Sequence, residues 1–243
     1  MLTSSRMIAV QREASAFGRR FRADLLSRYE QEYGETAPPP AIIGAEVAQD
    51  FLGAKVVFDP LPLHLFGETT IRDGSPLITM NSLTGQIEGV KDPRGVQGTG
   101  IWHEMIHVER DLHILRVGPQ ATLPGMVIDQ TIACHRATAV TIPGRFSMHE
   151  YFAEVAGRAA AVSYPHLLKT DSFSRFANLA RRHLASNQAS WRLLYDAAQE
   201  IGVNISALVK QLGEDGLLAV ERSEGRSILY PQPTLAEEME SIA

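Results

Sequence analysis

The sequence predicts an α+β fold in which helices surround a small β-sheet and a helical module with a β-hairpin follows. Apolar residues recur at the spacing of an amphipathic helix in several segments, the first of them over residues 5–33. Short runs of β-branched and apolar residues at 55–58 and 76–80 have the length and composition of strands. The chain has 243 residues, 44% of them hydrophobic, so it is long enough to bury a substantial core.

The composition excludes several kinds of partner. The net charge is −5 at pH 7, so neither nucleic acid nor an anionic membrane surface is an expected partner. Cys134 is the only cysteine and cannot form an internal disulfide, which is typical of a reducing compartment. The first residues lack the pattern of a signal peptide, and no window of about 20 apolar residues could cross a membrane. We therefore expect a cytoplasmic protein, and the sequence leaves its oligomeric state open.

Proline and glycine mark the boundaries of the N-terminal elements. Pro38-Pro39-Pro40 ends the first helix, because proline cannot continue a helix, and Gly53 ends the second. Asp73-Gly74 has the composition of a two-residue hairpin turn. The predicted elements are helices at 5–33 and 41–52 and strands at 55–58, 69–72 and 76–80.

The rest of the chain is predicted to be mostly helical. Residues 81–97 are rich in glycine and are predicted to form a loop, and Thr99 is expected to cap the helix that follows. The stretch 117–147 has no regular pattern and is long for a loop, so a short helix or a lid is expected there. The predicted elements are helices at 101–115, 149–162, 171–186, 188–201 and 205–212, and a hairpin that pairs 217–221 with 227–230.

The C-terminal segment has the element order of a winged helix-turn-helix, over residues 190–231. A helix that reads DNA should be basic, but here Lys210 is followed by Glu214 and Asp215. This pattern favours a packing or protein-docking module, and direct nucleic-acid binding is not expected. We therefore predict two units, at residues 1–168 and 169–243.

The segment His103-Glu104-Met105-Ile106-His107 has the spacing of a catalytic zinc site. Residues four apart lie on one face of a helix, so His103 and His107 can present two imidazole nitrogens to one ion. Glu104 lies beside them, where its carboxylate can take a proton from a water held by the ion. The motif predicts a zinc-dependent metalloprotease with Glu104 as the catalytic base, although Mn²⁺ or Fe²⁺ would also suit two imidazoles and a carboxylate.

A third protein ligand is needed, and the sequence offers two candidates. His113 has the position of the third histidine of metzincins, but those proteins break the helix at a glycine where this chain has Arg110. On an unbroken helix the ten residues from His103 to His113 rise about 15 Å, too far for one ion. Glu150, with Glu154 one turn on, resembles the gluzincin arrangement, in which the first carboxylate binds zinc and the second supports a ligand histidine. The reverse assignment of these two carboxylates stays open, and a metzincin-type protease that uses His113 is kept as an alternative.

Together these features resemble the ImmA/IrrE-type metallopeptidases over roughly residues 38–165. The resemblance implies a zincin-like domain with a small β-sheet and an active-site helix, in which His103, His107 and Glu150 are the metal ligands and Glu104 is the general base. Glu154 stands where that family usually has asparagine. The matching segments, in order, are the proline-rich entry, the strand at 55–58, Pro76-Leu-Ile-Thr-Met-Asn81, Gly100-Ile-Trp-His-Glu-Met-Ile-His107 and Glu150-Tyr-Phe-Ala-Glu-Val-Ala-Gly157.

The resemblance also implies a biological role. The family cleaves DNA-binding transcriptional repressors in phage, mobile-element or stress-response circuits, so a protein substrate of this kind is the expected partner. Two other functions stay open. One is a regulatory protein that keeps the metal site but acts by binding through its C-terminal module, and the other is a DNA-binding regulator with a structural metal.

Two features near the motif have open roles. His149, beside Glu150, is a candidate for stabilising an oxyanion or contacting substrate. The strand at 77–80 lies either at the edge of the sheet, where an extended substrate can pair with it, or in the interior of the sheet.

Overall fold

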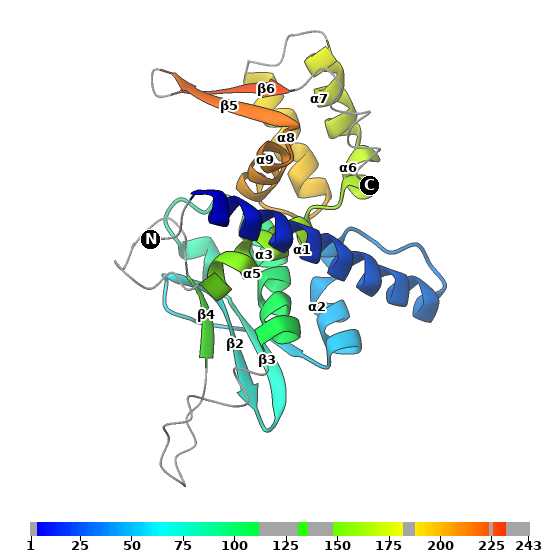
Figure 1. Ribbon diagram of the computed structural model, residues 1–243, viewed down its shortest axis with the longest axis vertical. Coiled ribbons are helices and arrows are strands. Elements are labelled where there is room, and N and C mark those ends of the chain that lie inside the picture. Colours follow the sequence, from blue (N-terminus) through cyan, green and yellow to red (C-terminus); the bar gives the residue numbers. More distant parts are fainter. Residues whose placement is uncertain (1–3, 112–130, 136–147, 182–187, 224–225, 232–243) are drawn as a thin grey trace.

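The computed structural model of the chain describes residues 4–111, 131–135, 148–181, 188–223 and 226–231 (Figure 1). They form an α+β fold, as predicted. The helices are α1 (Ser4–Tyr33), α2 (Pro40–Leu52), α3 (Pro93–Ile106), α5 (Met148–Ala161), α6 (Tyr164–Leu168), α7 (Asp171–Arg181), α8 (Gln188–Glu200) and α9 (Ile205–Glu214). A short 3₁₀ turn (Thr84–Gln86) precedes α3, and a π-helical turn (His107–Asp111) extends it. The strands are β1 (Lys55–Asp59), β2 (Leu65–Arg72), β3 (Ser75–Asn81), β4 (Thr131–His135), β5 (Leu218–Ser223) and β6 (Arg226–Pro231).

The first four strands form one mixed sheet in the order β1-β3-β2-β4. β1 runs parallel to β3, whereas β3 and β4 both pair antiparallel with β2. Asp73 and Gly74 join β2 to β3 with φ values of 52° and 80°, as a turn that is left-handed at both central residues requires. β3 therefore lies in the interior of the sheet, so the interior alternative for residues 77–80 is correct and the edge alternative is wrong.

Helix α3 begins earlier than the sequence predicts. It starts at Pro93, and Asp92 caps it by accepting a hydrogen bond from the backbone N–H of Gly95 at 3.0 Å. The expected cap at Thr99 is therefore wrong, and so is the last part of the loop predicted over residues 81–97.

Packing explains why a glycine-rich segment is helical here. A Cβ atom at Gly98 would lie 2.5 Å from the carbonyl oxygen of Gly202 and 2.7 Å from that of Ala41, so the missing side chain lets two other backbones contact α3. Glycine lowers intrinsic helix propensity, but tertiary packing outweighs it in this segment.

The helices stack on the sheet in layers. α3 packs on β2 and β3, α5 packs on α3, and α1 packs on α5. In Figure 1 the sheet lies at one end of the molecule, α7 to α9 with β5 and β6 lie at the other, and α1 crosses between them. A Cβ atom at Gly157 of α5 would lie 2.6 Å from the Cα atom of His103. Helix α5 thus lies directly against the backbone of the motif helix.

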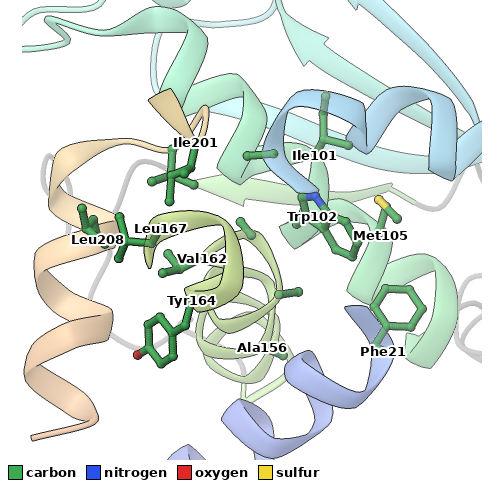
Figure 2. Packing of buried hydrophobic residues seen from close by; sticks show 14 of the residues in the cluster. Phe21, Ile101, Trp102, Met105, Ala156, Val162, Tyr164, Leu167, Ile201 and Leu208 are labelled. Atoms are coloured by element: carbon green, nitrogen blue, oxygen red, sulfur yellow. The ribbon is translucent and has the colours of Figure 1, made fainter. Parts of the chain in front are cut away.

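One hydrophobic core connects the elements. Figure 2 shows Phe21 of α1 beside Trp102 of α3, and their rings meet edge to face with centroids 6.0 Å apart. The same cluster includes Leu167 of α6, Ile201, which directly follows α8, and Leu208 of α9 (Figure 2). The core therefore includes residues from both predicted units, and the division at residue 168 stays a prediction.

Most other predicted elements are confirmed with ends that differ by a few residues, and the predicted helix ends at 115 and 186 lie outside the described residues. The strand β4 is an exception, since it lies in the stretch 117–147 where a short helix or a lid was expected. The rest of that stretch lies outside the described residues. None of the helices in the described part of the chain is long and apolar enough to cross a membrane.

Candidate metal centre

The candidate site lies where α3 and its π-helical extension face the first turn of α5. His103 and His107 lie one turn apart, with their Nε2 atoms 3.1 Å from each other. Glu150 of α5 places Oε2 3.4 Å from His103 Nε2 and Oε1 3.4 Å from His107 Nε2. The three candidate ligand atoms lie within 4.8 Å of one another, so this group can hold a metal ion.

The donors fit a divalent ion in chemistry and in spacing. Two imidazole nitrogens and one carboxylate oxygen are a common ligand set for such ions. Donors that lie about 2.0–2.2 Å from a tetrahedral ion are about 3.3–3.6 Å apart. The two Nε2 atoms are 3.1 Å apart, and each lies 3.4 Å from a different oxygen of Glu150, so each imidazole has a carboxylate oxygen close to this spacing. The described residues thus bring together the three ligands that the sequence predicted.

The electrostatics of the site show which charge it favours. Burial alone would lower the pKa of His107, but its hydrogen bonds to Asp111 and Glu150 outweigh burial and raise the pKa to about 9. Burial alone would raise the pKa of Glu150, but hydrogen bonds to His103 and His107 lower it to about 2. The site is therefore an anionic environment that stabilises positive charge between the ligands.

Asp111 is a site residue that the sequence reasoning missed. Its Oδ2 atom lies 2.8 Å from Nδ1 of His107, and its side chain is only 1% exposed. Burial would raise the pKa of Asp111, but hydrogen bonds to His107 and His149 lower it below its usual range. A signal was available, since Asp111 follows His107 at the same four-residue spacing that separates the two motif histidines.

Glu154 lies one turn along α5 from Glu150. The ligand group contains Glu150 and not Glu154, so the geometry supports Glu150 as the third ligand. Glu154 forms ion pairs with Arg158, at 3.1 Å, and with Lys210. Support of a ligand histidine by Glu154 therefore stays a prediction, and the hydrogen bond from His107 goes to Asp111.

Glu104 is fully buried beside the ligands. Thr69 of β2 donates a hydrogen bond to its Oε2 atom at 2.6 Å, whereas Oε1 has no hydrogen-bond partner among the described residues. A Cβ atom at Gly67 would lie 3.2 Å from Oε1, so the missing side chain leaves room beside that oxygen. Burial raises the pKa of Glu104. No local sequence pattern could have identified Thr69 or Gly67, because both are about 35 residues from Glu104 along the chain.

His149 has a partner within the chain. Its Nδ1 atom lies 3.0 Å from Oδ1 of Asp111, and its side chain is 48% exposed. The predicted role of His149 toward an oxyanion or a substrate stays a prediction. His113, the metzincin candidate, lies outside the described residues, but the chain stays helical through Arg110, where a metzincin helix would break.

Comparisons of the chain with protein-family models, curated proteins and solved structures find no match. The resemblance to ImmA/IrrE-type metallopeptidases therefore stays a prediction. The functional argument rests on the geometry of His103, His107 and Glu150 and of the residues around them.

Proposed function

We propose that the protein is a zinc-dependent endopeptidase in which His103, His107 and Glu150 hold the ion and Glu104 is the general base. One observation carries the proposal. Glu104, a buried carboxylate with one oxygen that lacks a described partner, directly follows one of the ligands in a group of two imidazoles and a carboxylate. Mn²⁺ or Fe²⁺ would suit the same donors.

The chain's own residues have the following parts in the proposed reaction. A bound zinc ion would supply Lewis acidity, which lowers the pKa of water and polarises a substrate carbonyl. Glu104 accepts a proton from the attacking water and returns it to the leaving amine. Because burial raises the pKa of Glu104, its carboxylate is a stronger base than an exposed one. Thr69 holds Oε2 by its hydrogen bond and leaves Oε1 for the proton.

The proposed substrate is a protein in the cytoplasm. The ordered resemblance over residues 38–165 supports a DNA-binding transcriptional repressor as the target. The single cysteine supports a reducing compartment.

The contacts of α9 support a packing role for the C-terminal module. In a winged helix this second helix would read DNA, but its Lys210 contacts Glu154, and its Glu214 contacts Arg158 at 2.6 Å. A helix whose basic residue is paired with α5 is poorly suited to contact phosphates. These contacts favour a protease over a DNA-binding regulator.

Two measurements test the proposal. First, metal analysis of the purified chain should find about one equivalent of zinc in the wild type and almost none in His103→Ala or Glu150→Ala, as expected for a closed ligand set. Second, a proteome-derived peptide library should be cleaved by the zinc-loaded wild type and not by Glu104→Gln, with a rate loss on the order of 10²–10⁴.

Glu46→Gln on the exposed face of α2 is the matched control, and it should cleave at the wild-type rate. If Glu104→Gln keeps its zinc and its full biological activity, the protein acts by binding and the protease proposal is wrong.

A further inference from the structure

The π-helical turn after the motif contacts both elements that supply ligands. Asp111 lies between His107 of the same turn and His149 of α5, with one carboxylate oxygen facing each ring. The preceding residue, Arg110, lies with its guanidinium carbon 3.8 Å from the ring centroid of Phe152. His149 and Phe152 lie on either side of Glu150, so this turn contacts α5 on both sides of the third ligand. Single π-helical turns within α-helices often occur at functional sites.

The two bonds of Asp111 determine which nitrogen of His107 can bind a metal. An ionised carboxylate only accepts hydrogen bonds, so Nδ1 of His107 must carry the proton that it donates at 2.8 Å. In the neutral ring this leaves the lone pair on Nε2, which is the atom beside His103 and Glu150. Asp111 therefore selects the ligand-competent tautomer of His107.

The second bond of Asp111 holds the end of α5. Glu150 lies in the first turn of this helix, where backbone N–H groups lack intrahelical partners and a helix tends to fray. The close contact at Gly157 with α3 is two turns further on. The hydrogen bond from His149 Nδ1 to Asp111 Oδ1, at 3.0 Å, ties the residue next to Glu150 to the turn that follows His107.

We propose that Asp111 is a positioning residue of the metal site, which orients His107 directly and fixes the position of Glu150 through His149. The inference rests on the proposed metal site and adds a residue that links the turn containing His107 to the helix containing Glu150. One buried carboxylate, 1% exposed, fixes the tautomer of one ligand and the location of another. Loss of either bond therefore weakens metal binding even when the three ligands are intact.

The first test measures Zn²⁺ affinity in the full-length protein by competition with a chromogenic chelator. Asp111→Asn keeps the size of the side chain but turns one acceptor oxygen into a donor, so it can no longer accept hydrogen bonds from both histidines. We expect Zn²⁺ to bind about 10–100-fold more weakly, as is typical when the hydrogen-bond partner of a ligand is lost. We also expect the visible absorption of the Co²⁺-loaded protein to shift, since a merely structural role would leave it unchanged. The matched control is Asp196→Asn, which removes an exposed carboxylate paired with Arg192 and should bind as the wild type does.

The second test separates the tie to α5 from the orientation of His107. His149→Asn keeps an N–H donor near the position of Nδ1, whereas His149→Phe removes it. Because His149 is 48% exposed, both variants should fold. His149→Phe should weaken Zn²⁺ binding several-fold, and His149→Asn should restore most of it. The double variant Asp111→Asn/His149→Phe should lose less affinity than the product of the two single losses, because both changes act on one bond.

The outcomes distinguish this inference from the proposed function. If His103→Ala loses Zn²⁺ but Asp111→Asn and His149→Phe bind it with wild-type affinity and an unchanged Co²⁺ spectrum, the positioning role is wrong and the metal site stands. If His103→Ala also binds as the wild type does, the proposed metal site itself is wrong. If Asp111→Asn does not fold, the comparison of His149→Phe with His149→Asn decides by the same criterion.

Discussion

Helix α5 contributes to two clusters of charged side chains whose negative charges are neutralised in different ways. Both contain carboxylates, and the helix supplies one carboxylate to each, from positions one turn apart. The ligand cluster consists of His103, His107, Asp111 and Glu150. The Arg158 cluster consists of Glu154, Arg158, Lys210 and Glu214.

The difference lies in where the positive charge comes from. Arg158 is 3% exposed and contacts both Glu154 and Glu214, and Lys210 adds a second positive charge, so the Arg158 cluster is neutralised by the chain itself. The ligand cluster contains two carboxylates, and Arg110 lies 3.7 Å from Oδ1 of Asp111, a longer contact than those of Arg158. The cluster also retains a proton on His107. A site that raises the pKa of a histidine to about 9 would also favour a metal cation in place of that proton. The charge balance thus separates a candidate metal site from a structural ion-pair network.

The largest expected effect comes from the same substitution at the two carboxylates of α5. Glu150→Gln removes one of three ligands and should weaken Zn²⁺ binding on the order of 10³-fold, about 4 kcal/mol. Glu154→Gln should weaken Zn²⁺ binding far less, because the ion pairs of Glu154 are with Arg158 and Lys210. Zinc competition titrations of the two variants give the comparison. The opposite pattern would make Glu154 the third ligand.

The next effect concerns the stability of the Arg158 cluster. Arg158→Met leaves Glu154 and Glu214 without their buried cation, and we expect it to lower the free energy of unfolding by about 3 kcal/mol. Arg192→Met is the matched control, because the pair of Arg192 with Asp196 is exposed and should contribute less than about 0.5 kcal/mol. Urea unfolding of the metal-free proteins measures both. Equal stabilities of the two variants would contradict the claim that Arg158 completes its cluster.

Local patterns made part of this arrangement predictable. Because His103 and His107 are four residues apart, helix geometry alone predicts that they share a face. The pair Asp73-Gly74 likewise predicts the hairpin turn. The same spacing could have pointed to Asp111, but its bond to His149 depends on a residue 38 positions further along the chain. A sequence pattern predicts contacts within a helix, whereas contacts between helices depend on the fold.

The failures of prediction have the same cause. The sequence predicts too late a start for α3 because its glycines oppose helix formation locally, while their packing against Ala41 and Gly202 favours it in the folded chain. The hydrogen bond from Thr69 to Glu104 joins a strand to a helix across 35 residues, so no periodic pattern in the sequence reveals it. The sequence favours Glu150 as the ligand but leaves the reverse assignment with Glu154 open, and their partners in space distinguish them.

The smallest expected effect is the pH dependence of the ligand cluster. In the metal-free protein the pKa of His107 is raised from 6.5 to about 9, so its proton stabilises the folded state fully below pH 6.5. That contribution is lost as the pH rises through about 9. Metal binding requires the neutral ring, so between these values binding should release a proton. Zn²⁺ affinity should then rise about tenfold per pH unit, roughly 1.4 kcal/mol.

Calorimetry at pH 7.5 in two buffers that differ in ionisation enthalpy counts this proton. The wild type should release about one proton per zinc ion, and Arg158→Met should release the same number, because the Arg158 cluster contains no histidine. Zinc affinity that falls with rising pH over this range, or binding without proton release, would mean that the metal does not replace the proton on His107. In that case the excess of carboxylates in the ligand cluster would not explain why a cation binds there.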